Sequence, residues 1–137
     1  MHPFLRNSLA VAAGIIVCMS LNMGIISISH LVIPPPLGAD MMTPEGLEAA
    51  MPLLEPKHFF MPFLAHAFGT LAGSYVASLL AINYKMRIAV AIGAFHLIGG
   101  ITAAFMIPAP SWFIATDLLF AYLPVAYLAG KINAFRR

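Results

Sequence analysis

Residues 59–82 read FFMPFLAHAFGTLAGSYVASLLAI, a run of 24 residues that contains no Lys, Arg, Asp or Glu. About 20 residues at a rise of 1.5 Å are enough for a helix to cross the roughly 30 Å hydrocarbon core of a bilayer. Apolar and polar residues do not alternate along this run, which argues against a strand of a membrane barrel. We therefore expect a transmembrane helix, because in lipid every backbone polar group must be bonded internally.

Three further apolar runs of similar length fill most of the 137-residue chain, at 7–33, 86–107 and 112–132. The chain is 61% hydrophobic and 9% charged, whereas soluble domains are about a quarter charged. The sequence thus predicts one all-α membrane domain with four transmembrane helices in an antiparallel bundle. The net charge of +2 gives no reason to expect a nucleic-acid partner, and the expected partner is the lipid bilayer.

The first run continues well beyond the apolar core of a secretory signal, which spans about 7–15 residues, so we expect a retained helix. The single cysteine, Cys18, lies inside this run and has no partner for an intrachain disulfide. We expect a buried structural thiol there.

Basic residues predict the orientation of the chain. With four spans, both termini and the joint between the second and third helices share one side of the membrane. Six basic residues fall on that side and one, Lys57, on the other, which by the positive-inside rule predicts cytoplasmic N- and C-termini. The six are Arg6, Lys85, Arg87, Lys131, Arg136 and Arg137.

Residues 34–57 form the longest connection, called here the 34–57 segment, and hold four of the five acidic residues. Three prolines at its start, Pro34 to Pro36, end the first helix. Thr43, Pro44 and Glu45 suit the N-cap and first two positions of a helix. We expect a short interfacial helix near 43–51, which covers the bundle or, alternatively, binds a partner.

Arg87 and Lys131 fall at the inner ends of their spans. Four further His and Asp side chains fall in the outer half or centre of the predicted bundle: His30, His66, His96 and Asp117. Such residues are rare in membranes and are candidate functional residues by default. Counted from the helix ends, His66 and Asp117 lie at a similar depth in the outer half of the membrane. Two interpretations stand: a His66–Asp117 hydrogen bond that joins two helices, or a proton or cation relay, since a His beside a carboxylate titrates near neutral pH.

The histidines also raise the question of a bound metal or haem. His30, His66 and Asp117 are weak candidates for a divalent metal, because imidazole and carboxylate suit zinc or manganese. His66 and His96 differ in depth by one or two turns, which would allow haem ligation, but no haem-attachment motif supports it. The sequence indicates no firm metal site and predicts no cofactor.

Small residues recur every fourth position in the second run, at Ala65, Gly69, Gly73 and Ala77. Such a stripe lets another helix approach closely and predicts helix packing, within the bundle or between copies. Pro124 lies inside the fourth run, where it removes one backbone hydrogen bond and predicts a kink that opens space near Asp117.

Two motifs carry a resemblance: His30-x-x-Ile33-Pro34-Pro35-Pro36-x-Gly38-x-Asp40, and LAHAFGTLAG at 64–73. They resemble a family of small bacterial four-helix membrane proteins, in which a Tyr often stands in place of Ile33. The resemblance extends to the turn at Ile107–Trp112 and to the helix that holds Asp117. It implies the same topology and a bacterial inner membrane. It implies no activity and no catalytic residues, because the family has no established activity.

Three function classes remain open from the sequence. The favoured one is a non-enzymatic structural or accessory subunit, associated with other membrane subunits or with a second copy, because no nucleophile–base set is visible. The first alternative is an oligomeric proton-coupled transporter or channel that uses Asp117 and His66. The second is an intramembrane protein that binds a metal, haem or a quinone.

Overall fold

The computed structural model describes residues 2–134, and every regular element in that range is a helix. Four helical stretches are long and apolar enough to cross a membrane: Pro3–Val32, Pro56–Leu80, Lys85–Met106 and Ser111–Ala134. They comprise α1 (Pro3–Val32), α3 (Phe60–Leu80), α4 (Lys85–Met106), α5 (Ser111–Phe120) and α6 (Leu123–Ala134). The expected all-helical fold with four such helices is confirmed. Phe135, Arg136 and Arg137 lie outside the described residues.

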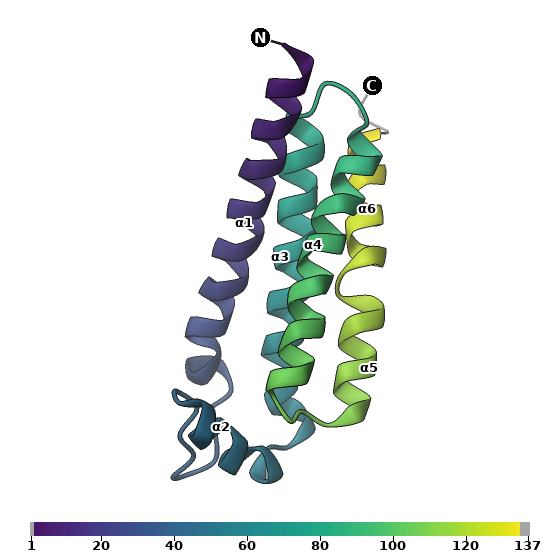
Figure 1. Ribbon diagram of the computed structural model, residues 1–137. Coiled ribbons are helices and arrows are strands. Elements are labelled where there is room, and N and C mark those ends of the chain that lie inside the picture. Colours follow the sequence, from purple (N-terminus) through teal and green to yellow (C-terminus); the bar gives the residue numbers. More distant parts are fainter. Residues whose placement is uncertain (1, 135–137) are drawn as a thin grey trace.

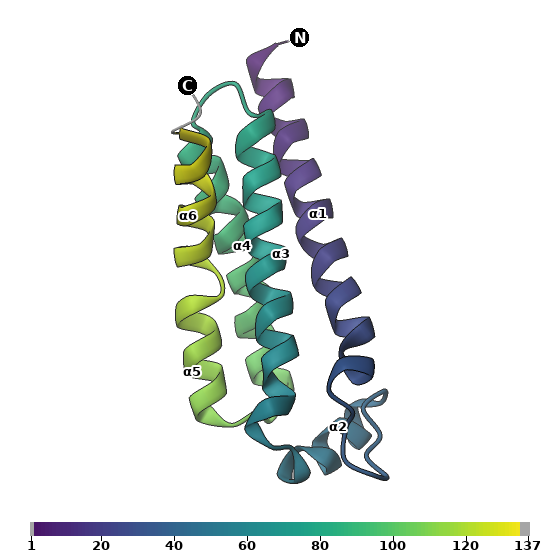
Figure 2. The ribbon, with the colours of Figure 1, turned by 180° about the vertical axis from the view of Figure 1, so that it is seen from behind.

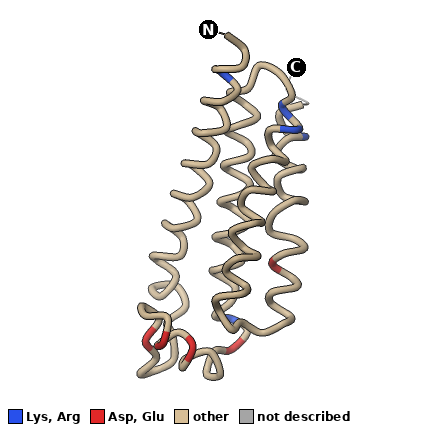
Figure 3. The backbone as a smooth tube through the Cα atoms, viewed as in Figure 1, with Lys and Arg blue, Asp and Glu red and all other residues tan. Residues whose placement is uncertain are grey.

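The long helices lie side by side, with both ends of the chain at one end of the molecule and α2 (Pro44–Ala50) at the other (Figures 1 and 2). Lys and Arg gather near the two termini, apart from one at the opposite end, whereas all acidic residues but one lie at the end that holds α2 (Figure 3). The basic exception is Lys57 of η2 (Pro56–Phe59), and the acidic exception is Asp117 of α5. The molecule is therefore electrically polarised along the helix axes.

Helix α1 begins four residues earlier than the expected start at residue 7. His2 is its N-cap and accepts a hydrogen bond from the backbone N–H of Phe4 at 3.3 Å, and Pro3 occupies the first helical position. Proline is well suited there, because its missing N–H has no partner in a helix start anyway. The hydrophobicity pattern missed these residues because capping, not apolarity, fixes this end.

Helix α1 packs along α3 through small residues. A Cβ added to Gly73 would lie 2.5 Å from Cβ of Cys18 and 2.6 Å from the carbonyl oxygen of Gly14. One added to Gly14 would lie 2.6 Å from Cβ of Ala77, and one at Gly69 would lie 2.9 Å from the carbonyl of Cys18. The stripe of Ala65, Gly69, Gly73 and Ala77 is accordingly buried, and its glycines place the two backbones in near contact.

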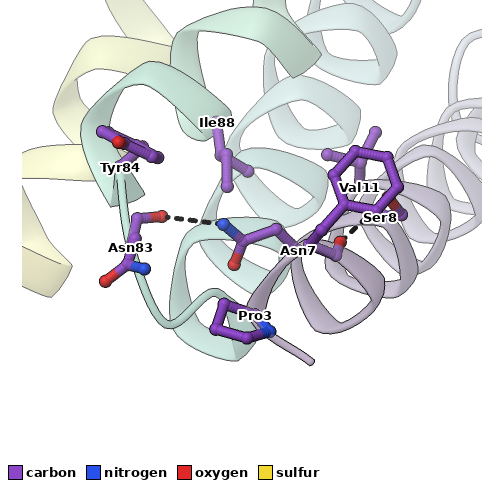
Figure 4. A pocket seen from close by; sticks show the side chains of 8 residues that line it. Pro3, Asn7, Ser8, Val11, Asn83, Tyr84 and Ile88 are labelled. Atoms are coloured by element: carbon purple, nitrogen blue, oxygen red, sulfur yellow. Dashed lines mark hydrogen bonds between the residues drawn. The ribbon is translucent and has the colours of Figure 1, made fainter. Parts of the chain in front are cut away.

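The first turns of α1 are tied to the joint between α3 and α4. The Asn7 side chain donates to the carbonyl of Asn83 at 3.5 Å and accepts from the amide of Ile82 at 3.0 Å. Tyr84 at the end of this joint has a positive φ of 56°. A shallow groove of about 550 Å³ lies here between α1 and α4 (Figure 4). Its polar groups are largely bonded to one another, so we regard it as a structural groove.

The 34–57 segment contains the expected short helix as α2, followed by the 3-10 helix η1 (Met51–Leu53). A second 3-10 helix, η2 (Pro56–Phe59), joins the segment to α3. The Thr43 hydroxyl accepts from the amide of Gly46 at 3.1 Å and donates to the Asp40 carboxylate at 2.7 Å. Asp40 also accepts from the amide of Met42, and these bonds hold its pKa below the ordinary value. The start of α2 is thus fixed by a side-chain network within the segment itself.

The fourth apolar stretch is interrupted at Ala121 and Tyr122, between α5 and α6. Pro124 has no N–H for the carbonyl of Phe120, and its ring would clash with that carbonyl in a continuous helix. The interruption therefore falls where the proline predicts a kink. It places the polar side chains described next.

Candidate functional site

Asp117 and His66 meet between α5 and α3. Asp117 is only 4% exposed, and its Oδ1 lies 2.8 Å from Nδ1 of His66. Depth counting from the sequence placed these two residues at the same level, and the helix faces bring them into direct contact. A bare carboxylate in hydrocarbon is costly, and a facing imidazole offsets much of that cost.

Tyr122 supplies the second bond to the carboxylate. Its hydroxyl donates to Oδ2 of Asp117 at 2.8 Å, and the whole side chain is fully buried. Five residues separate the two, a spacing that does not bring side chains together in a regular α-helix. The break at Ala121 and Tyr122 makes this bond available.

His96 of α4 joins the same cluster through Thr70 of α3. Nδ1 of His96 lies 2.8 Å from the Thr70 hydroxyl oxygen, which itself lies 2.7 Å from the carbonyl oxygen of His66. A hydroxyl has one hydrogen to donate. If Thr70 donates to the carbonyl, as is common in helices, His96 must donate from Nδ1.

Three rings pack against one another at this point. The His66 ring stacks on Tyr122 with centroids 5.6 Å apart, and His96 meets Tyr122 edge to face at 5.1 Å. His66 and His96 are 5.9 Å apart and also edge to face. Gly100 of α4 is needed beside them, because a Cβ there would overlap the Tyr122 hydroxyl. The cluster is therefore closely packed as well as hydrogen-bonded, which fixes the orientation of each ring.

A cavity of about 580 Å³ opens on this cluster. Its walls come from α1, the 34–57 segment, α3, α4 and α5, and they are mostly apolar. Met51 and Leu54 line it from the 34–57 segment, and His66 and Asp117 line it from α3 and α5. Pockets for small molecules are of this size and character: about 300–1,000 Å³, apolar, with a few placed polar groups.

His66 lines the cavity, and only one of its two ring nitrogens has a hydrogen-bond partner among the described residues. Its Nδ1 is bonded to Asp117, and its side chain keeps 20% exposure. Among the described residues Nε2 has no hydrogen-bond partner, and it is not one of the fully buried unpaired polar atoms. The bond made by one ring nitrogen of a histidine sets the role of the other. The bond to Asp117 therefore fixes the His66 ring and leaves Nε2 as its second hydrogen-bonding group.

His30 does not belong to the hydrogen-bonded cluster that contains His66, His96 and Asp117. It lines the cavity from the end of α1, but no hydrogen bond in the described part of the chain joins it to His66 or Asp117. Residues 2–134 contain no group of three His, Cys, Asp or Glu side chains arranged to hold a metal ion. The edge-to-face contact of His66 with His96 leaves no space for a porphyrin between them. The geometry therefore supports neither the metal nor the haem alternative.

Comparisons with protein-family models, with curated proteins and with solved structures found no match.

Two members of the cluster, Thr70 and Tyr122, were not singled out from the sequence. Thr70 lies four residues after His66, the helical spacing at which it reaches the same face. Tyr122 lies two residues before Pro124, where the chain leaves the helix. Helical spacing from His66 could have identified Thr70, whereas the turn of Tyr122 toward Asp117 depends on the geometry of the break.

Proposed function

We propose that this chain spans the bacterial inner membrane as an antiparallel four-helix bundle with cytoplasmic termini. The charge distribution supports this orientation: Arg6, Lys85, Arg87 and Lys131 belong to helix ends beside the termini, whereas Lys57 is alone at the opposite end. The apolar surface of the long helices suits lipid. The 34–57 segment then lies on the outer side, over the mouth of the cavity.

Within that bundle the cavity binds a small, neutral, lipid-soluble molecule, and the protein is a non-enzymatic binding or accessory subunit. One observation carries this proposal: an apolar cavity of about 580 Å³ ends on a buried Asp117–His66 pair with an open imidazole nitrogen. A purely structural helix-joining pair needs no cavity beside it. Ser27 and Ser29, the two described hydroxyl residues that line the cavity, bond to backbone carbonyls of their own helix instead of to His66, which favours binding over covalent chemistry.

Mass spectrometry of the intact protein, released from membranes in mild detergent, tests this proposal. Ala104 lines the cavity from α4, so Ala104→Phe should fill part of it. Ala115 of α5 is exposed and does not line the cavity, so Ala115→Phe adds the same ring outside. We expect a bound small molecule on the wild type and on Ala115→Phe, and its loss from Ala104→Phe. Equal retention by both variants would contradict binding in this cavity.

A second candidate function, proton-coupled transport by an oligomer, is favoured by the His66–Asp117 hydrogen bond itself. A relay requires that the pair exchange a proton, which Asp117→Asn prevents while keeping hydrogen-bonding groups in place. Proton flux into liposomes that is present in the wild type and absent in Asp117→Asn would favour transport. Equal background flux in both would contradict transport, and binding would remain as the single candidate function.

A further inference from the structure

The geometry points to a quinone or quinol as the molecule in this cavity, with one ring oxygen bonded to Nε2 of His66. It further indicates that the number of protons on the His66–Asp117 pair determines which form binds. The pair with two protons binds the quinone, and the pair with one proton binds the quinol. This inference rests on the proposed binding function and names its ligand class.

The number of protons on the His66–Asp117 pair decides whether Nε2 of His66 donates or accepts a hydrogen bond. With one proton, Asp117 is ionised and accepts from Nδ1–H of His66, so Nε2 carries a lone pair and accepts a hydrogen bond. With two protons, Nε2 carries a hydrogen in either arrangement, an imidazolium with a carboxylate or a neutral imidazole with a carboxylic acid. The site is thus an acceptor or a donor according to pH. A quinol hydroxyl suits the acceptor and a quinone carbonyl suits the donor.

Charge at the end of the cavity excludes an anionic head group. The pair carries a formal charge of −1 with one proton and 0 with two, and no Lys or Arg lines the cavity among the described residues. A fatty acid or a phospholipid phosphate would therefore bring its charge beside a carboxylate with no basic side chain to neutralise it. A cationic head group would be attracted to the one-proton pair, but it would have to lose its water in a mostly apolar cavity, which is costly.

The walls suit a flat ring with an apolar tail. Phe59 of η2 and Phe113 of α5 both line the cavity, with centroids 4.9 Å apart. Aromatic rings favour offset or edge-to-face contact with a further ring. Methionines line the same space, among them Met23 and Met51, and their flexible thioethers adapt to an irregular chain. An alcohol of isoprenoid type would use the polar contact but not the aromatic wall.

Several other titratable groups lie near His66, and the experiment has to distinguish their effect on the pH dependence of binding from that of His66. Asp117, Tyr122 and His96 contact it from α5, the helix break and α4. Two histidines share the cavity wall. His58 has both ring nitrogens within bonding distance of backbone groups of Glu55 and Pro34. His30 of α1 also lines the cavity, and within residues 2–134 its ring has no hydrogen-bond partner. Helix α1 also contributes the buried thiol of Cys18 to this part of the bundle.

Quenching of Trp112 fluorescence measures binding, because Trp112 is the single tryptophan and its ring packs 5.5 Å from that of Phe59. The probe is a benzoquinone with one isoprenyl unit, titrated into the full chain in lipid nanodiscs. Its quinol, decanoic acid and a 15-carbon isoprenyl alcohol serve as competitors. We expect saturable quenching whose Kd for the quinone rises with pH, by at most tenfold per unit for one linked proton, while the quinol competes better at higher pH.

Three variants separate the possible causes. His66→Gln keeps a polar side chain but does not titrate, so the pH dependence should disappear while weaker binding remains. His2→Gln, at the far end of α1, and His30→Gln should keep the pH dependence. Loss of the pH dependence in His30→Gln instead of His66→Gln, or its absence in the wild type, would overturn the inference.

The outcome also distinguishes this inference from the proposed function. If decanoic acid or the alcohol competes better than the quinol at every pH, and Ala104→Phe abolishes that binding, the cavity binds a ligand of another class and only the inference fails. If no probe binds saturably and Ala104→Phe equals the wild type, both fail. Saturable quinone binding that Ala104→Phe removes and Ala115→Phe keeps, with the expected pH dependence, supports both.

Discussion

Removal of the Asp117 carboxylate should destabilise the protein to a degree that depends on what replaces it. Asp117→Leu leaves two donors without an acceptor, Nδ1–H of His66 and the hydroxyl of Tyr122. One unpaired buried polar group costs about 1–3 kcal/mol in soluble proteins, and interhelical hydrogen bonds in membranes average about 0.6 kcal/mol. For two such groups these values give a loss of about 1–6 kcal/mol.

Asp117→Asn should cost much less. Its carbonyl accepts from His66, and its amide group donates to the oxygen of Tyr122, so both contacts keep a hydrogen bond. We expect a loss of about 1 kcal/mol or less. Tyr122→Phe removes the donor to Oδ2 of the buried Asp117 carboxylate, so we expect a larger loss, of about 1–3 kcal/mol.

The free energy of unfolding in mixed micelles of mild detergent and dodecyl sulfate, followed by circular dichroism, measures these differences. Thr116→Leu is the matched control, because Thr116 is exposed and its hydroxyl bonds only to the carbonyl of Trp112 in its own helix. It should change stability by less than about 0.5 kcal/mol. An Asp117→Leu variant as stable as Asp117→Asn would refute the reasoning, since the two bonds would then contribute nothing.

Three further predictions concern packing, the α2 cap and topology. Gly73→Ala should destabilise by about 1–3 kcal/mol through contact with Cys18 and Gly14, whereas Gly99→Ala, which meets nothing within 4 Å, should be neutral or stabilising in the same unfolding assay. Because its folded pKa is depressed, Asp40 stabilises the start of α2 above the ordinary value of 3.8, and this contribution is lost as pH falls through the folded pKa. Hydrogen exchange of the Gly46 amide should then accelerate relative to its intrinsic rate, and in Asp40→Asn this pH dependence should be absent. A periplasmically active phosphatase should be inactive when fused after Arg137 and active when inserted at 45–55, and the reverse result would contradict the topology.

The sequence predicted the long helices well because apolar runs and their proline ends are local signals. Pro34 and Pro108 follow the ends of α1 and α4 within two residues. The start of α1 was placed late, at residue 7 instead of Pro3, because a cap at His2 carries no hydrophobic signal. The fourth run was predicted as one helix with a kink at Pro124, and the structure divides it into α5 and α6.

Only part of the site could be predicted from the sequence. The levels of His66 and Asp117 follow from counting residues along straight helices, which is why their pairing was a reasonable expectation. His30 is also at the outer end of its helix, but depth does not determine rotation about the helix axis or the tilt of α1. Tyr122 depends on the local break, and the cavity depends on how five elements diverge. Neither can be read from spacing alone.

The bonding state of His66 tests the central claim most directly. The chain has five histidines, so the protein labelled with 15N at its histidine rings and embedded in nanodiscs gives few resonances, which single His→Gln variants assign. The account predicts that the isoprenyl benzoquinone shifts Nε2 of His66 most strongly, with no such shift in Ala104→Phe. A quinone response centred on another histidine, or an equal response in Ala104→Phe, would contradict it.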